Sequence, residues 1–222
     1  MAPKSPDQAR LSFDDALSFD DALSFDGVVL CGGASSRMGT DKAFVDFGGA
    51  PLVKRPLRAL VKATKQIAVG GDEARLLALG LEFLDDPEPK GGPAVAVLAA
   101  AEHLATQSDS HATMVVLSCD LPLIDQAAVH TLVRTQQRSG ADVVVPLRFG
   151  RPQWLVSAWN RRVLTTVRAS SSMSMRDLSR HFSVLYLLET QLEHCCLDTD
   201  TPEDLTLAQP VQIAHNDVQS KQ

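Results

Sequence analysis

The sequence predicts a three-layer α/β fold, with a mostly parallel sheet covered by helices on both faces. Short, continuous apolar runs alternate with helical patterns between residues 27 and 210. Strands of a parallel sheet are buried on both faces and therefore have this unbroken apolar character. The chain has 222 residues, of which 45% are hydrophobic and 22% charged, which is enough to build one core without disulfides or a metal.

The strands are predicted by apolar runs that end at glycine or acidic residues. The first run stops at Gly32-Gly33 and the second at Gly70-Gly71. The run TMVVLS is the most apolar, and it leads into Cys119 and Asp120. In chain order, extended segments are expected at 27–31, 66–69, 81–84, 113–118, 142–147, 154–159 and 183–188.

The helices are predicted by apolar positions at helical spacing and by capping residues. Asp125 is a suitable N-cap for the fourth helix, which Gly140 ends. Pro202 takes the first position of the last helix, after the cap Thr201. Pro56 either kinks the first helix or marks its start. In chain order, helices are expected at 51–63, 73–79, 93–105, 125–138, 160–168, 173–180 and 202–207.

The N-terminal segment, residues 1–26, contains the repeat LSFDDA written more than twice. Its period of six fits neither a helix nor a heptad, and it holds too little apolar mass to fold alone, so we expect an acidic, disordered tail. The alternative is an acidic, aromatic docking segment. Residues 27–210 have no linker and are expected to form a single domain, followed by a loose tail at 211–222.

Composition and charge exclude several classes of protein. The formal net charge of −6 argues against a nucleic-acid partner. However, Lys4 and Arg10 stand against six aspartates in residues 1–26, so −4 belongs to the tail and only −2 to the rest. No apolar stretch reaches the roughly 18 residues of a membrane span, and the N-terminus does not resemble a signal peptide. The four cysteines lack zinc spacing and indicate reduced thiols in a cytoplasmic protein.

The loop after the first strand carries the strongest functional signal. In an open α/β sheet, ligands bind beyond the carboxyl ends of the strands. The stretch from Leu30 to Lys42 reads LCGGASSRMGTDK. Its glycines let backbone N–H groups approach an anion, while Arg37 and Lys42 add two positive charges. This set suits a polyphosphate whose charge grows during reaction. It matches neither the P-loop nor the dinucleotide pattern GxGxxG, which disfavours a dinucleotide-dependent oxidoreductase.

LCGGASSRMGTDK resembles the LAGGxSxRMGxDK signature of molybdenum cofactor guanylyltransferases. The resemblance covers roughly residues 27–205. It implies a Rossmann-like nucleotidyltransferase fold and transfer of GMP from GTP to molybdopterin, with release of pyrophosphate and a requirement for Mg²⁺. Proteins that insert molybdenum or mature molybdoenzymes are then candidate partners. For the nucleotide, the resemblance implies contacts from Leu30, Cys31, Gly32 and Gly33, with Lys42 and Arg37 in catalytic roles. The second glycine, Gly33, favours guanylyl over cytidylyl transfer.

Carboxylates at other strand ends complete the expected site. Asp120 lies at the carboxyl end of a buried strand and is not needed as a helix cap, so it can bind a metal. The resemblance assigns it catalysis, nucleotide binding and Mg²⁺. It also carries Asp86 and Gly92 over as nucleotide contacts. Asp200, in the closing motif, and Arg151 are weaker candidates for the metal and the acceptor.

Three positions depart from the family pattern. Gly70 replaces an asparagine that meets guanine in many guanylyltransferases, and Ala94 and Ala96 replace residues of the GPLxG motif. We expect the methyl group of Ala96 to crowd the approach to the base. Two alternatives therefore stay open: a related transferase that uses CTP or another phosphorylated acceptor, and a non-catalytic nucleotide-binding protein.

Overall fold

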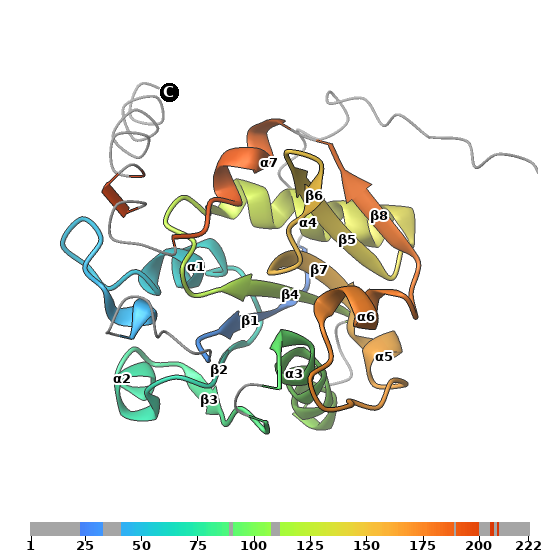
Figure 1. Cartoon of the computed structure of the whole chain (residues 1–222), viewed down its shortest axis with the longest axis horizontal. Coiled ribbons are helices and arrows are strands. Elements are labelled where there is room, and N and C mark those ends of the chain that lie inside the picture. Colours follow the sequence, from blue (N-terminus) through green and yellow to red (C-terminus); the bar gives the residue numbers. More distant parts are fainter. Residues whose placement is uncertain are drawn as a thin grey trace, which may run out of the picture.

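Figure 1 shows a computed structural model of the chain, which forms an eight-stranded sheet between two layers of helices. The structure describes residues 23–32, 41–88, 91–107, 112–188, 190–199, 205, 206 and 208. The expected tails at 1–22 and 211–222, and most of the last predicted helix, lie outside these residues. No helix in the described part of the chain has the length and apolarity needed to cross a membrane.

The sheet is mostly parallel, as predicted. Its order is β3-β2-β1-β4-β7-β5-β6, with β8 paired to the side of β5. β1 is parallel to β2 and β4, and β5 is parallel to β8, whereas β7 runs antiparallel between β4 and β5. The strand bounds are β1 Asp26–Leu30, β2 Gln66–Val69, β3 Glu82–Leu84, β4 Thr113–Ser118, β5 Val143–Arg148, β6 Arg151–Pro152, β7 Val156–Asn160 and β8 Val184–Leu187.

Two hydrophobic clusters fill the spaces between the layers. Alternate strand residues point to opposite faces: Val29 packs in one cluster, and Val28 and Leu30 in the other. α1, α2, α4 and α7 cover the first face, and α3, α5 and α6 the second, as Figure 1 shows for α4 and α7 above the sheet. The helix bounds are α1 Lys54–Ala59, α2 Glu73–Leu77, α3 Pro93–Gln107, α4 Gln126–Ser139, α5 Arg161–Leu164, α6 Met175–Ser179 and α7 Thr190–Cys195, with a 3-10 turn at Lys42–Phe44. The predicted fold class is confirmed.

Several helices are shorter than predicted. The helix expected over 51–63 is confined to α1, and Pro56 is its third residue, where the backbone needs no N–H donor. Asp125 caps α4 by accepting from Ala128 N at 2.8 Å, and Gly140 ends it in the left-handed conformation at φ 67°. α7 was not predicted, because its apolar residues follow no clear helical period.

The packed domain begins before the predicted boundary at residue 27. Phe25 is fully buried and Asp26, 1% exposed, opens β1, although both were assigned to the tail. Leu23 packs against the same core cluster. The last copy of the repeat is therefore part of the fold, since its Leu and Phe find apolar neighbours from other elements.

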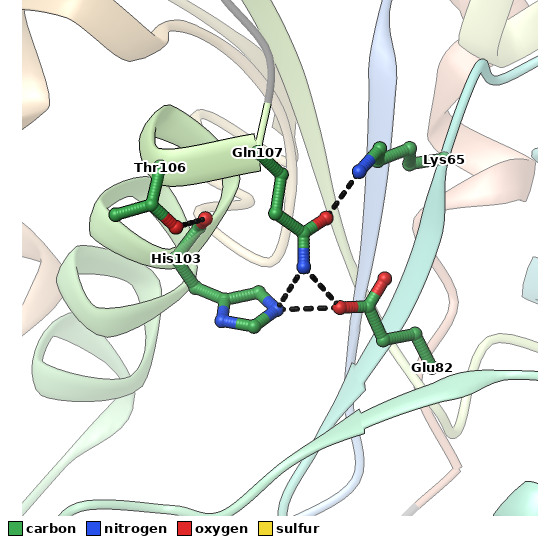
Figure 2. A network of polar contacts seen from close by, with 5 residues as sticks. All are labelled: Lys65, Glu82, His103, Thr106 and Gln107. Carbon is green, nitrogen blue, oxygen red and sulfur yellow. Dashed lines mark hydrogen bonds and ion pairs between the residues drawn. The ribbon is translucent and has the colours of Figure 1, made fainter.

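A polar network links the C-terminal end of α3 to the start of β3, at the edge of the sheet (Figure 2). His103 Nε2 lies 2.6 Å from Glu82 Oε1 and 2.8 Å from Gln107 Nε2, and Gln107 also contacts Glu82 and Lys65. Burial of Glu82 acts to raise its pKa, but hydrogen bonds from Gln107 and His103 outweigh burial and lower that pKa. The network lies at the amino ends of β2 and β3, away from the carboxyl edge, so its role is to anchor α3.

Candidate active site at the carboxyl edge of the sheet

The chain reverses its direction of travel across the sheet between β1 and β4. From β1 it moves outward to β2 and β3, and then returns to add β4 on the other side of β1. Such a switch point leaves a crevice above the carboxyl ends of the two central strands. Cys119 N donates to Leu30 O at 3.1 Å, which places Gly32 and Asp120 at the same edge.

Lys42 and Asp120 form the central pair of this edge. Lys42 Nζ lies 3.3 Å from Asp120 Oδ2, and the two side chains are 16% and 13% exposed. Their positions are 78 residues apart in sequence, so only the tertiary fold brings them together. Both groups are largely buried but keep some access to solvent. When a ligand enters, the lysine can exchange its carboxylate partner for a phosphate, and the aspartate can bind a metal.

Neighbouring groups hold this pair in place. Asp41 accepts from Ala43 N at 3.1 Å and caps the short 3-10 turn that begins with Lys42. On the other side, Ser118 Oγ donates to Asp120 Oδ1. The Asp120 carbonyl accepts from both the N–H and the hydroxyl of Thr199, each at 3.2 Å. Thr199 is fully buried, so the closing segment of the chain fixes the backbone that carries the carboxylate.

The predicted nucleotide side is built from two glycines and Asp86. A Cβ atom placed on Gly32 would lie 3.1 Å from Asp86 Oδ2, and one on Gly70 would lie 2.9 Å from Gly32 Cα. Gly70 also has φ 69°, which disfavours any residue with a side chain. The backbones at Gly32 and Gly70 can therefore approach this closely only because position 70, where the family pattern has asparagine, is a glycine.

The backbone of the first strand is partly committed to the sheet. Cys31 N and Gly32 N both donate to Val69 O, at 2.9 and 3.1 Å, and Leu30 O accepts from Cys119. Leu30 and Cys31 are 6% and 7% exposed. These residues are therefore buried at the carboxyl edge of the sheet, and the N–H groups of Cys31 and Gly32 are engaged by Val69.

A cavity of about 470 Å³ opens on the other side of Asp120. Its walls come from five separate parts of the chain, which meet only in the folded state. They are Ser118, Asp120 and Leu121 at and just after the end of β4; Pro152, Gln153, Trp154, Leu155 and Val156 from the end of β6 to the start of β7; Ser174, Met175 and Arg176 at the start of α6; Pro93 at the start of α3; and Cys196 and Asp198 after α7. Arg176 brings a positive charge, and Trp154 an aromatic wall that packs edge-on against Tyr186 with ring centroids 6.3 Å apart.

Sequence reasoning named Arg151 as a cation for this region and missed Arg176. Arg151 is exposed on β6 and does not line the cavity. One sequence signal near Arg176 was the helix start at Ser174, whose Oγ accepts from Asp177 N at 3.1 Å. Arg176 lies in the first turn of that helix. The loop before Ser174 approaches α3 closely: a Cβ on Gly92, which has φ 93°, would meet Met173 O at 2.8 Å. Gly92 is thus needed for packing at this wall.

Ala94 and Ala96 are 0% and 6% exposed and belong to the core cluster between α3 and the sheet. Leu30, at the end of β1, belongs to the same cluster. These two departures from the family motif therefore contribute apolar packing, and the expected crowding of the base by Ala96 stays a prediction.

Three candidate residues lie outside the described part of the chain, namely Gly33, Arg37 and Asp200. Their assignments stay predictions. Asp198 is described and lines the cavity with Asp120, although its neighbour Asp200 was the stronger candidate in the sequence.

The carboxylates suit a magnesium ion that is shared with a substrate. No group of three or more His, Cys, Asp or Glu side chains with metal-site geometry occurs among the described residues. Magnesium is usually held by one or two carboxylates together with phosphate oxygens and water. Asp120 at the strand end, with Asp198 in the same cavity, fits that requirement and does not fit a closed structural metal site.

The cysteines beneath the edge are poor nucleophiles. A hydrogen bond with Cys31, followed by burial, raises the pKa of Cys119 well above its usual value. Burial also raises the pKa of Cys195 and of Cys196, each to about 12. The thiolate is the reactive form, so these residues contribute packing at the site.

Comparisons with known proteins indicate the family of the chain. The model of the MobA-like NTP transferase domain matches residues 27–186. A protein from Bacillus subtilis (strain 168), described as a probable molybdenum cofactor guanylyltransferase, is 34% identical over 166 residues, covering 72% of this chain and 80% of its own. A protein of the same description from Pelotomaculum thermopropionicum is 28% identical over 192 residues, covering 82% and 90%.

A solved structure supports the same fold. The molybdopterin-guanine dinucleotide biosynthesis protein A from Archaeoglobus fulgidus superposes with a TM-score of 0.61 at 21% identity, covering 85% of this chain and 99% of its own. At this identity the likeness concerns the fold. Together with the domain match over most of the sequence, it establishes that the chain belongs to the family of MobA-like NTP transferases.

Proposed function

We propose that this chain transfers GMP from GTP to molybdopterin and releases pyrophosphate. The observation that carries the proposal is the Lys42–Asp120 pair at the switch point, with the closely packed glycine backbone of Gly32 and Gly70 at the same edge and a cavity of about 470 Å³ lined by Asp120. A transferase needs two substrate sites that meet at one charged centre. Family membership and relatives described as molybdenum cofactor guanylyltransferases support this choice of substrates.

In the proposed reaction, a terminal phosphate oxygen of molybdopterin attacks the α-phosphorus of GTP. A bond forms between that oxygen and the α-phosphorus, while the bond to the bridging oxygen breaks and pyrophosphate leaves with its electron pair. The nucleophile is already an anion, so no side chain has to form a covalent intermediate. Catalysis then rests on positioning and on stabilisation of developing charge.

The chain's own residues divide these tasks. Lys42 neutralises the phosphates, and Asp86 and Gly32 form the boundary of the nucleotide site. Gly33 and Arg37 contribute further contacts on the strength of the sequence motif. The family suggests a requirement for a divalent metal; Asp120 would hold Mg²⁺, which supplies charge neutralisation to the phosphate oxygens when bound. Ser118 and Thr199 keep the Asp120 carboxylate aimed at that position.

The cavity beyond Asp120 is the proposed acceptor site. Arg176 would bind the acceptor phosphate, and Trp154 offers an aromatic surface next to polar groups of Gln153 and Ser174. A planar heterocycle that carries a phosphate fits such walls. We place the reaction in the cytoplasm, which agrees with four cysteines that form no disulfide. Proteins that insert molybdenum or mature molybdoenzymes are the proposed recipients of the product.

Pyrophosphate release from GTP, measured with and without molybdopterin, tests the proposal. We expect release that depends on both the acceptor and Mg²⁺. Asp120→Ala and Lys42→Ala should each lower turnover on the order of 100–1,000-fold, because each removes a charge aimed at the transition state. Urea unfolding of each variant should remain cooperative, which separates loss of chemistry from loss of folding.

Matched controls are available outside the proposed site. Asp46→Ala removes an exposed aspartate whose carboxylate accepts from Gly49 N at 3.3 Å in a turn, and Lys54→Ala removes a half-buried lysine at the start of α1. Both should keep normal turnover. Near-normal turnover in the two site variants would refute the assignment of the site. Faster turnover with CTP than with GTP would instead indicate a cytidylyltransferase, and nucleotide binding without pyrophosphate release would indicate a non-catalytic protein.

A further inference from the structure

The chain enters the fold between α1 and α4. Ser24 O accepts from Gln137 Nε2 of α4 at 3.1 Å, and Phe25 O accepts from Thr64 N, after α1, at 2.8 Å. Leu23 and Phe25 pack into the cluster beneath the two helices. The last copy of the LSFDDA repeat therefore uses its Leu and Phe to bury apolar surface, and the two preceding copies are joined to the chain at this entry point.

That surface is basic. Residues 54–62 and 126–139 contain no acidic residue. Their basic residues are Lys54, Arg55, Arg58, Lys62, Arg134 and Arg138, together with His130. We call this surface the basic face. α1 and α4 are in contact with each other. Burial, followed by the charges of Arg134 on α4 and Lys62 after α1, lowers the pKa of His130. Val61, which is 54% exposed, adds an apolar side chain next to Lys62 in the sequence.

The preceding repeat copies complement this face in charge and in apolar content. Residues 11–22 read LSFDDALSFDDA and contain four aspartates and no basic residue. They repeat the Leu-x-Phe pair that packs into the core in the last copy, where Phe25 is fully buried and Leu23 partly buried. Asp20 and Asp21 precede Leu23 by three and two residues, and since an extended chain spans at most about 3.5 Å per residue, they can reach no further than roughly 10 Å from the entry point.

We propose that residues 11–22 bind the basic face of their own chain, with Asp20 and Asp21 next to Lys62, Arg134 and Arg138. Exposed ion pairs are individually weak. Here the segment is tethered at Leu23, so its effective concentration at the face is in the millimolar range for a short link. Tethering favours the chain's own repeat over a second copy or another acidic molecule, and the binding is separate from the active site at the carboxyl edge.

Zero-length carbodiimide cross-linking of the full chain tests this proposal. The reagent joins a carboxylate to a lysine only when the two groups are in contact, and mass spectrometry identifies the linked peptides. A mixture of ¹⁵N-labelled and unlabelled protein distinguishes links within a chain from links between chains. We expect links from Asp20 or Asp21 to Lys62, formed within single chains. Their yield should fall severalfold between ~0.05 M and ~0.5 M NaCl, because salt screens charges beyond a few ångström.

Charge reversal supplies the matched comparison. The double variant Arg134→Glu, Arg138→Glu keeps both cross-linking partners but reverses the charge beside them, so we expect at least a severalfold lower yield. Arg162→Glu, an exposed arginine on α5 at the other helix layer, should leave the yield unchanged. The salt series on the unchanged protein remains decisive if the double variant fails to fold.

Three results would overturn the proposal. They are links that join labelled to unlabelled chains, links that form equally to lysines away from the basic face, and a yield that is insensitive to salt. The first would assign the face to a second copy of the chain, and the other two would leave the repeat without a defined binding surface.

Discussion

Gly70 offers a sharp test of the site's architecture, because both its backbone angle and its surroundings exclude a side chain. Gly70→Ala places a methyl group 2.9 Å from Gly32 Cα and 3.1 Å from Gly32 N, both backbone atoms of the first-strand loop. It also forces alanine to adopt φ 69°. The left-handed angle costs about 1–2 kcal/mol, and overpacking against a backbone that cannot rotate away costs a further 1–3 kcal/mol, on the order of other overpacked sites.

Gly140→Ala is the matched control. Gly140 has φ 67°, and no atom lies within 4 Å of the position its Cβ would take. This variant therefore carries the backbone cost without the steric clash. We expect a loss of stability of about 1 kcal/mol for Gly140→Ala and about 3 kcal/mol for Gly70→Ala. With a urea dependence of ~2 kcal/mol per molar, the midpoints should shift by roughly 0.5 M and 1.5 M.

Steady-state kinetics distinguish a structural role from a role at the site. If Gly70→Ala relieves its clash by moving Gly32, the KM for GTP should rise about tenfold or more, since small misplacements of a binding element are costly. Gly140→Ala should leave KM unchanged, because Gly140 ends α4 just before β5 begins, at the amino edge of the sheet, whereas Gly32 follows the carboxyl end of β1. Equal midpoint shifts and equal KM values for the two variants would refute the close packing of Gly70 against Gly32.

Three further predictions concern the cavity, pH and the thiols. Arg176→Ala should raise the KM for the acceptor about tenfold or more, as expected for loss of a charged hydrogen bond, with the KM for GTP unchanged; an unchanged acceptor KM would contradict the proposed phosphate contact. Burial and nearby cations lower the folded-state pKa of His130. The unfolded chain therefore binds the proton more readily, so stability should fall as the pH drops below about 6.5, and His130→Gln should flatten this loss in urea titrations at pH 5 to 8. Cys195 and Cys196, with pKa values of about 12, should react with a disulfide reagent only on unfolding, and fast labelling of the native protein would contradict their burial.

Much of the fold was predictable because its signals are local. The β4 bounds agree with the prediction, since six consecutive apolar or small residues between polar loops can only be a buried strand here. Asp125 and Gly140 mark the ends of α4 through side-chain capping and the left-handed angle, which act within a few residues. The loop motif likewise identified Lys42, and the strand end identified Asp120, because each depends on residues next to it in the chain.

Features that depend on distant contacts were not predictable. The antiparallel insertion of β7 between β4 and β5 follows from sheet topology, which the strand's own residues do not encode. The burial of Phe25 depends on neighbours supplied by α1 and α4, so composition alone placed it in the tail. The place of Ala96 in the core cluster likewise depends on how α3 packs against the sheet.

The sequence by itself determined the fold class, the phosphate-type loop and the identity of the central cation and carboxylate. Only the tertiary structure decided that Lys42 meets Asp120 at 3.3 Å and that the backbone of Gly32 leaves no room for a side chain at position 70. It also decided that Arg176 rather than Arg151 lines the cavity. The physical reason is the range of the interactions. Helix caps, turns and apolar periodicity act over a few residues. A site, by contrast, is formed by side chains at the ends of different strands, which are dozens of residues apart in the sequence.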